Sequence, residues 1–323
     1  MAGRRWLVLA GLIAWAVLPQ VLSRQYVDLL VFAAIYGTAG LGVGLLLGHG
    51  GIVTLAQSAF YAIGAYASAY VTVTLKWPLP AGVLAGALLC GTLAFGLGWP
   101  VLRFRGYFLA IATLALALIA NALFYEWDWL TGGAIGIGSI PKANLFGLVL
   151  DTPARFYYVA WLVLGIAMLL VRNLVAGRTG LAVRGMRDSS EAARGLGMDV
   201  HLLRVQMFVV CAVLGSIAGS MFAHYTGYVS VASFSIDTSI LFLLIPVLGG
   251  VTSIAGVVVG AIFITFVPAL LSGAGELHGV VFGLALVLVV LAAPHGIAGV
   301  AASLYVRFGK TRDGSSGPGT AAP

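Results

Sequence analysis

The sequence predicts an all-α integral membrane protein with about ten transmembrane helices. Of its 323 residues, 61% are hydrophobic and only 8% are charged, whereas soluble domains carry about 25% charged residues. The mean hydropathy of +1.07 agrees with this. The net charge of +7 fits loops that face an anionic membrane surface better than it fits a protein that binds nucleic acid.

The apolar residues gather into runs, and a helix needs about 20 of them to cross a bilayer. Because Arg4 and Arg5 precede the first run, it also resembles a signal peptide, but its length favours retention. Cleavage there would leave the orientation of the later spans unchanged. In chain order, the runs are Trp6–Leu22, Tyr26–Leu47, Gly51–Val73, Ala81–Leu102, Tyr107–Phe124, Tyr157–Val171, Val205–Gly227, Thr238–Gly250, Ile254–Leu271 and Gly279–Ala293.

The Lys and Arg residues predict the orientation, because cytoplasmic loops carry an excess of them. With the N-terminus in the cytoplasm, most of the 17 basic residues lie inside, and the exceptions are Arg24, Lys76, Lys142 and Arg155. We therefore expect both termini in the cytoplasm, a cytoplasmic loop over 172–204 and an external loop over 125–156. Residues 1–308 would form the membrane domain, and the Gly/Ser/Pro-rich residues 309–323 a disordered cytoplasmic tail.

Small residues recur every four positions in several runs, which predicts close helix packing in a membrane. Two stretches also resemble each other, one that begins at Gly50 and one that begins at Gly249. Each has paired glycines after a Leu-rich run, followed by Thr or Ser within an apolar helix. Related segments in two halves indicate a pseudo-symmetric transporter with broken helices.

The chemistry of most other classes of membrane protein is missing from the sequence. Ionisable residues within the runs are limited to Asp28 and His224, both near span ends, although proton-coupled carriers place such groups in the membrane. A membrane enzyme would need a nucleophile with its base, or a set of metal ligands. There is no GxxxxGK[ST] loop for ATP either. We expect no cofactor, no metal and no catalytic residue in this chain.

Polar residues at the start of the third run are candidates for a transport pathway: Thr54, Gln57 and Ser58. Polar groups in a span usually satisfy neighbouring helices, and that alternative stays open for all three. Pro246 and Pro268 lie inside spans, where they can break a helix and turn its carbonyl groups toward a cavity.

One charged segment, Arg178–Arg204, interrupts the apolar sequence. Asp188 to Glu191 has the form of a capping box, with Asp188 as N-cap and Glu191 at the third helical position. This predicts a short helix over Ser189–Leu196 that stops at Gly197. Because so short a helix is marginal alone, its small Ala192–Ala193 face is expected to dock in the groove of a soluble partner. The alternative is a solvated basic loop.

The residues Glu191-Ala192-Ala193-x-x-x-Gly197 resemble the EAA-x-x-x-G loop of ABC importer permeases, whose coupling helix docks on the ATPase. No Ile-x-Leu-Pro follows Gly197, which argues against the maltose-type importers. The resemblance implies that ATPase coupling involves Arg184, Arg187, Asp188, Ser189, Glu191, Ala192, Ala193 and Gly197.

Further segments resemble the branched-chain amino acid permease family, and its LivM type in particular. They are GIVTLAQSAFYAIGAYASAY, LRFRGYFLAIATLALA, TGGAIGI, LLIPVLGGVTSIAGVVVGA and GVVFGLALVLVVLAAPHGIAG. Ala134-Ile135 departs from the family, which often has polar residues there.

The resemblance implies a pseudo-symmetric ABC importer permease in the inner (plasma) membrane of a bacterium. Its partners would be a second, LivH-like permease subunit, two cytoplasmic ABC ATPases, an extracytoplasmic substrate-binding protein and membrane lipids, with no nucleic acid. The implied substrates are leucine, isoleucine or valine. Urea or short amides are the alternative substrates, and a secondary carrier or channel is the alternative class.

Overall fold

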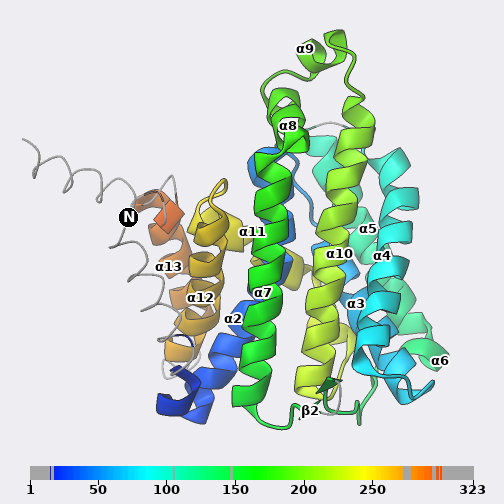
Figure 1. The fold of residues 1–323 in the computed structure, drawn as a ribbon, viewed down its shortest axis with the longest axis vertical. Helices are drawn as coiled ribbons and strands as arrows, with labels where there is room; N and C mark the ends of the chain where they lie inside the picture. Colours follow the sequence, from blue (N-terminus) through cyan, green and yellow to red (C-terminus); the bar gives the residue numbers. More distant parts are fainter. Residues whose placement is uncertain are drawn as a thin grey trace, which may run out of the picture.

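The computed structural model describes Trp15, residues 18–104, 106–145, 148–271 and 278–292, and residues 296, 297 and 299 (Figure 1). The first expected span, Trp6–Leu22, lies mostly outside these residues, and so do Arg105 and the tail 309–323. In chain order the elements are α2 (Arg24–Gly44), η1 (Leu45–His49), α3 (Gln57–Val73), α4 (Leu79–Val101), α5 (Tyr107–Glu126), α6 (Asp128–Thr131), β1 (Asn144–Leu145), β2 (Leu148–Val149), α7 (Pro153–Ala176), α8 (Arg178–Asp188), α9 (Ser190–Gly195), α10 (Val200–Thr226), η2 (Val231–Phe234), α11 (Ile236–Gly249), α12 (Ile254–Leu271) and α13 (His278–Ala292).

The described residues form a helical protein whose β1 and β2 make one short antiparallel pair. Within the described part of the chain, six helices are long and apolar enough to cross a membrane: α2 together with η1, α4, α5, α7, α10 and α12. Every other expected run beyond the first also contains a helix, but α3, α11 and α13 have only 17, 14 and 15 residues. The all-helical membrane class is thus supported, and the number of ten spans stays a prediction.

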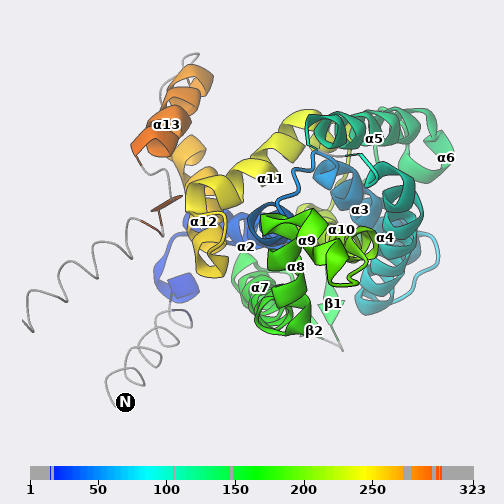
Figure 2. The same ribbon diagram turned by 90° about the horizontal axis from the view of Figure 1, so that it is seen from above.

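The helices surround α2, α3 and α10, which lie at the centre when the molecule is seen from above (Figure 2). Much of α2 and α10 is buried inside the protein, whereas α4, α5, α7 and α12 leave most of their residues on the outside. Glycines bring the central helices together. A methyl group on Gly219 of α10 would come 1.8 Å from the Tyr61 carbonyl oxygen of α3. The predicted small-residue packing is confirmed at this crossing.

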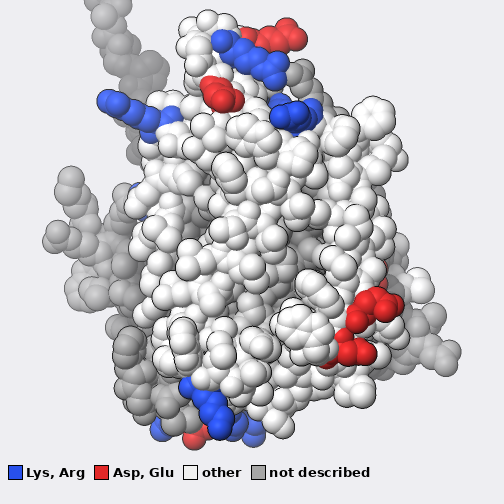
Figure 3. All heavy atoms as spheres, turned by 90° about the vertical axis from the view of Figure 1, so that its right-hand side faces the viewer, with Lys and Arg blue, Asp and Glu red and all other residues white. Residues whose placement is uncertain are grey.

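The charged side chains gather at the two ends of the helices, and the middle of the visible face is almost free of them (Figure 3). Figure 1 shows α8 and α9 at one end, and α6 with the β1–β2 pair at the other. The end opposite α9 carries three of the four basic residues expected outside, Arg24, Lys142 and Arg155. The turn before α4, which contains the fourth, Lys76, lies at the same end. The basic residues are thus divided between the two ends of the helices, and the orientation in the membrane stays a prediction.

Candidate functional site

The segment predicted to couple to an ATPase projects from one end of the helices as α8 and α9 (Figure 1). The predicted capping box is not formed. Asp188 is the last residue of α8, and Ser189 is the N-cap of α9, with its hydroxyl accepting from the Ala192 N–H at 3.2 Å. Glu191 therefore stands one position earlier than a capping box needs. The cap is shifted because α8 continues through Asp188 and only Ser189 turns extended, at φ −153°.

The predicted stop at Gly197 is confirmed. Gly197 has φ +81°, a left-handed conformation that glycine adopts without a steric penalty. Its N–H donates to the Arg194 carbonyl at 2.9 Å, and the Met198 N–H donates to the Ala193 carbonyl at 3.1 Å. These two bonds form a Schellman motif. Helix α9 is therefore short but fixed at both ends.

The two alanines of α9 do not form one free face, which corrects the expected docking surface. Ala193 is only 2% exposed and packs within its own chain, whereas Ala192 is exposed. Leu196, at the end of α9, is 80% exposed. The exposed residues of α9 and its C-terminal end therefore include Glu191, Ala192 and Leu196, whereas Ala193 packs against the rest of the chain.

Arg187 connects this segment to the membrane helices. Its guanidinium donates to the carbonyl oxygen of Gly48 in η1. The stem of the same side chain lies against Gly51, where an added methyl would come 3.3 Å from Arg187 Cγ. Gly51 has φ +64° and marks the break between α2 and α3. Arg184, like Arg187, is exposed overall.

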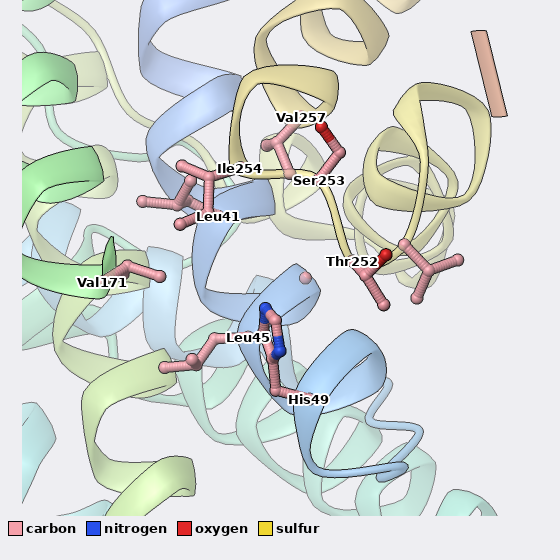
Figure 4. A pocket seen from close by; sticks show the side chains of 10 residues that line it. Leu41, Leu45, His49, Val171, Thr252, Ser253, Ile254 and Val257 are labelled. Carbon is pink, nitrogen blue, oxygen red and sulfur yellow. The ribbon is translucent and has the colours of Figure 1, made fainter. Parts of the chain in front are cut away.

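The residues just before this break meet the turn between α11 and α12. A methyl group on Gly48 would come 2.0 Å from the carbonyl oxygen of Val251. Between η1 and this turn lies a cavity of about 10 Å³, which is room for about one water molecule. Figure 4 shows its lining side chains, with Leu45 and His49 from η1 on one side, and Thr252, Ser253 and Ile254 on the other.

The expected pathway candidates lie in the interior, where α3 begins. Thr54, Gln57 and Ser58 are all buried. The Gln57 amide donates to the carbonyls of Ala39 at 3.0 Å and Cys211 at 3.3 Å. The third run is helical only from Gln57 onward, so Thr54 stands in the non-helical link and accepts from the Ala56 N–H at 3.3 Å.

Ser58 is bonded in the same way to α11. Its N–H donates to the Ser239 hydroxyl at 2.9 Å, and that hydroxyl donates back to the Ser58 hydroxyl at 2.8 Å. These bonds connect the start of α3 to α2, α10 and α11. A role of Thr54, Gln57 and Ser58 in the pathway stays a prediction.

Sequence reasoning missed several polar groups of the interior. Ser239 was one of many serines, and only the fold brings it to Ser58. The hydroxyl groups of Tyr61 and Tyr66 on α3 are buried and have no hydrogen-bond partner among the described residues. At the end opposite α9, a cavity of about 380 Å³ lies beside Asp28, which accepts from the Tyr225 hydroxyl. Asp28 is the one carboxylate within the second run, and this was the sequence signal that could have pointed to its pairing with Tyr225.

Comparison with known proteins places these features in a family. The profile described as "Branched-chain amino acid transport system / permease component" matches residues 25–290. The high-affinity branched-chain amino acid transport system permease protein LivM of Escherichia coli K12 is 33% identical over 319 residues, which cover 90% of this chain and 73% of the relative.

More distant relatives extend the comparison. LivH of Escherichia coli K12 is 24% identical over 85% of this chain and 95% of its own length. The autoinducer 2 import system permease protein LsrC of Yersinia enterocolitica is 24% identical over 83% of this chain and 75% of its own. No solved structure shows a significant match.

Proposed function

Since the chain belongs to the branched-chain amino acid transport system permease family, we propose that it is the LivM-type permease subunit of an ATP-driven importer. The observation that carries this proposal is the family match over residues 25–290, which includes nearly all described helices. The proposed substrates are leucine, isoleucine and valine, delivered by an extracytoplasmic binding protein. The chain itself performs no covalent chemistry, and ATP hydrolysis belongs to two partner ATPase subunits.

The proposed assembly pairs this chain with a second, LivH-like permease in the inner membrane of a bacterium. The similarity to both LivM and LivH supports a pair of related but different subunits. Residues 1–308 would be the membrane domain with both termini in the cytoplasm, and 309–323 the tail. The loop 172–204 would face the ATPases, and the loop 125–156 the binding protein. The arginines at the α9 end support this orientation.

Coupling would run from α9 to the break between α2 and α3. An ATPase that binds Glu191, Ala192 and Leu196 can move α9 as a unit, because the two ends of α9 are fixed by the hydrogen bonds at Ser189 and Gly197. Helix α8 joins α9 directly and carries Arg187, which holds Gly48. Movement of α8 would therefore pull on η1.

A pull on η1 would be transmitted in two directions. On one side Gly48 touches the α11–α12 turn at Val251. On the other side the link to α3 leads to Gln57 and Ser58, whose hydrogen bonds hold α2, α10 and α11 together. A rearrangement of these bonds is our proposal for how the pathway opens. In the same proposal Arg184 and Asp188 lie next to the ATPase surface.

Other solutes are the alternative for the substrate. LsrC, whose name assigns it to autoinducer 2 import, resembles this chain over most of its length, so the fold alone does not select amino acids. Urea or short amides remain the second candidates. The choice is tested in vesicles that contain both permeases, the ATPases, internal ATP and the external binding protein. We expect uptake of labelled leucine that unlabelled isoleucine and valine inhibit. Uptake of urea with no uptake of leucine would overturn the substrate assignment.

A further inference from the structure

A basic cavity of about 270 Å³ lies beside α9, between the end of α4 and the start of α10. Four basic side chains from three parts of the chain line it, and none of its described lining residues is acidic. Two buried apolar residues complete the wall. The lining residues are Leu102, Arg103, Arg194, Val200, His201 and Arg204.

Contacts within the chain position two of the four basic groups. The His201 ring packs edge-on against Trp99, with ring centroids 4.7 Å apart, and its Nε2 atom is buried without a hydrogen-bond partner among the described residues. Arg204 donates to the Ser190 hydroxyl at 3.3 Å. The nearby Asp199 carboxylate is used as a helix cap and accepts the N–H groups of His201 and Leu202 at 3.0 Å.

Three guanidinium groups and an imidazole around one cavity match a phosphate, because arginine binds phosphate oxygens through paired N–H groups. The surroundings distinguish a lipid from a soluble anion. Phe95, Trp99 and Phe104 are exposed along and just beyond α4, next to the cavity. Aromatic rings at this level suit the interface of a membrane, and they give acyl chains an apolar surface to lie on.

We propose that this cavity binds the phosphate of an anionic phospholipid from the leaflet on the α9 side. Arg194 belongs to α9, whereas Arg103 follows α4 and Arg204 belongs to α10. A bound headgroup would therefore tie α9 to two membrane helices and hold the coupling segment in position. The binding itself follows from the cavity alone, and only this consequence for coupling rests on the proposed function.

The test measures lipid retention by the purified full-length protein in neutral detergent, using native mass spectrometry. Phosphatidylglycerol, phosphatidylcholine and inorganic phosphate are titrated separately. Two double variants are compared with wild type. The first carries Arg103→Gln and Arg194→Gln. The control carries Arg172→Gln and Arg178→Gln, which removes the same charge from exposed arginines at the same end. We expect phosphatidylglycerol to bind better than phosphatidylcholine. The first double variant should weaken the affinity for phosphatidylglycerol about 30-fold, since each arginine near an anionic lipid contributes roughly a factor of five. The control should leave this affinity unchanged.

Equal weakening in both variants would overturn the site, and so would equal retention of the two lipids. Binding of inorganic phosphate as tight as that of phosphatidylglycerol would overturn the lipid as its source. If the arginine variants do not purify intact, the conservative variant Trp99→Phe, which keeps all four basic groups, still gives an answer. Brominated phosphatidylglycerol should quench more fluorescence in wild type than in Trp99→Phe, and this difference should be clearly larger than the one that brominated phosphatidylcholine gives. A failure of leucine uptake would leave each of these results unchanged.

Discussion

Gly219 shows how single atoms decide the packing of the central helices. An added methyl would overlap the Tyr61 carbonyl oxygen, a backbone atom that cannot rotate away, whereas Gly96 on α4 has open space around it. Gly219→Ala should destabilise the protein by about 1–3 kcal/mol, the usual cost of overpacking. Gly96→Ala should be neutral or slightly stabilising. Thermal unfolding in detergent compares the two, and equal melting temperatures would contradict the observed crossing of α3 and α10.

Tyr61 carries a buried hydroxyl without a partner among the described residues. An unsatisfied buried polar group costs about 1–3 kcal/mol, so Tyr61→Phe should raise the thermal stability of this conformation. If the hydroxyl finds a partner only when the pathway opens, the same variant should lower the transport rate. A Tyr61→Phe protein that melts at a lower temperature than wild type would show that the hydroxyl is already bonded. Phe60→Leu, a change beside it on the same helix, serves as the control for altered packing.

At the scale of elements, the contact between α8 and η1 is the link that can carry movement. Arg187→Met keeps an unbranched apolar stem against Gly51 but removes the donors that hold the Gly48 carbonyl. A hydrogen bond from a charged donor contributes about 1.5–3 kcal/mol. We expect basal ATP hydrolysis of the assembled importer to persist and its stimulation by substrate to fall several-fold. Arg178→Met, at the exposed start of α8, is the control, and a similar fall there would assign the effect to lost charge.

The sequence predicted the positions of the helices well and their interruptions poorly. The run Gly51–Val73 contains no charged residue, and nothing in it marks Gln57 as the first helical residue. The break has Gly51 at positive φ and follows Gly48, which touches Val251 some two hundred residues later. Likewise, Asp188 and Ser189 are both favourable N-cap residues, and the choice depends on how far α8 extends. The burial of Ala193 beside exposed Ala192 depends on tertiary packing that no local pattern contains.

At the scale of the whole molecule, the orientation has a direct test. Ser189 and Ser139 are exposed and lie in the loops at opposite ends, whereas the natural cysteines Cys90 and Cys211 are buried. In intact cells, Ser139→Cys should react with a membrane-impermeant maleimide, and Ser189→Cys should react only after the membrane is opened. Reaction of both in intact cells would contradict the placement of α8 and α9 in the cytoplasm.

In the proposed function, α9 transmits movement between this permease and an ATPase. Because Ala192 is exposed and Ala193 is buried, Ala192→Trp alters the docking surface without disturbing the segment beneath. The matched control is Ala176→Trp, an exposed position at the end of α7.

The most direct measurement is substrate-stimulated ATP hydrolysis by the complete importer in vesicles, with the loaded binding protein present. We predict that Ala192→Trp abolishes most of the stimulation, because a packed interface absorbs little added volume, while Ala176→Trp keeps it at the level of wild type. Equal stimulation in Ala192→Trp and Ala176→Trp would contradict the account.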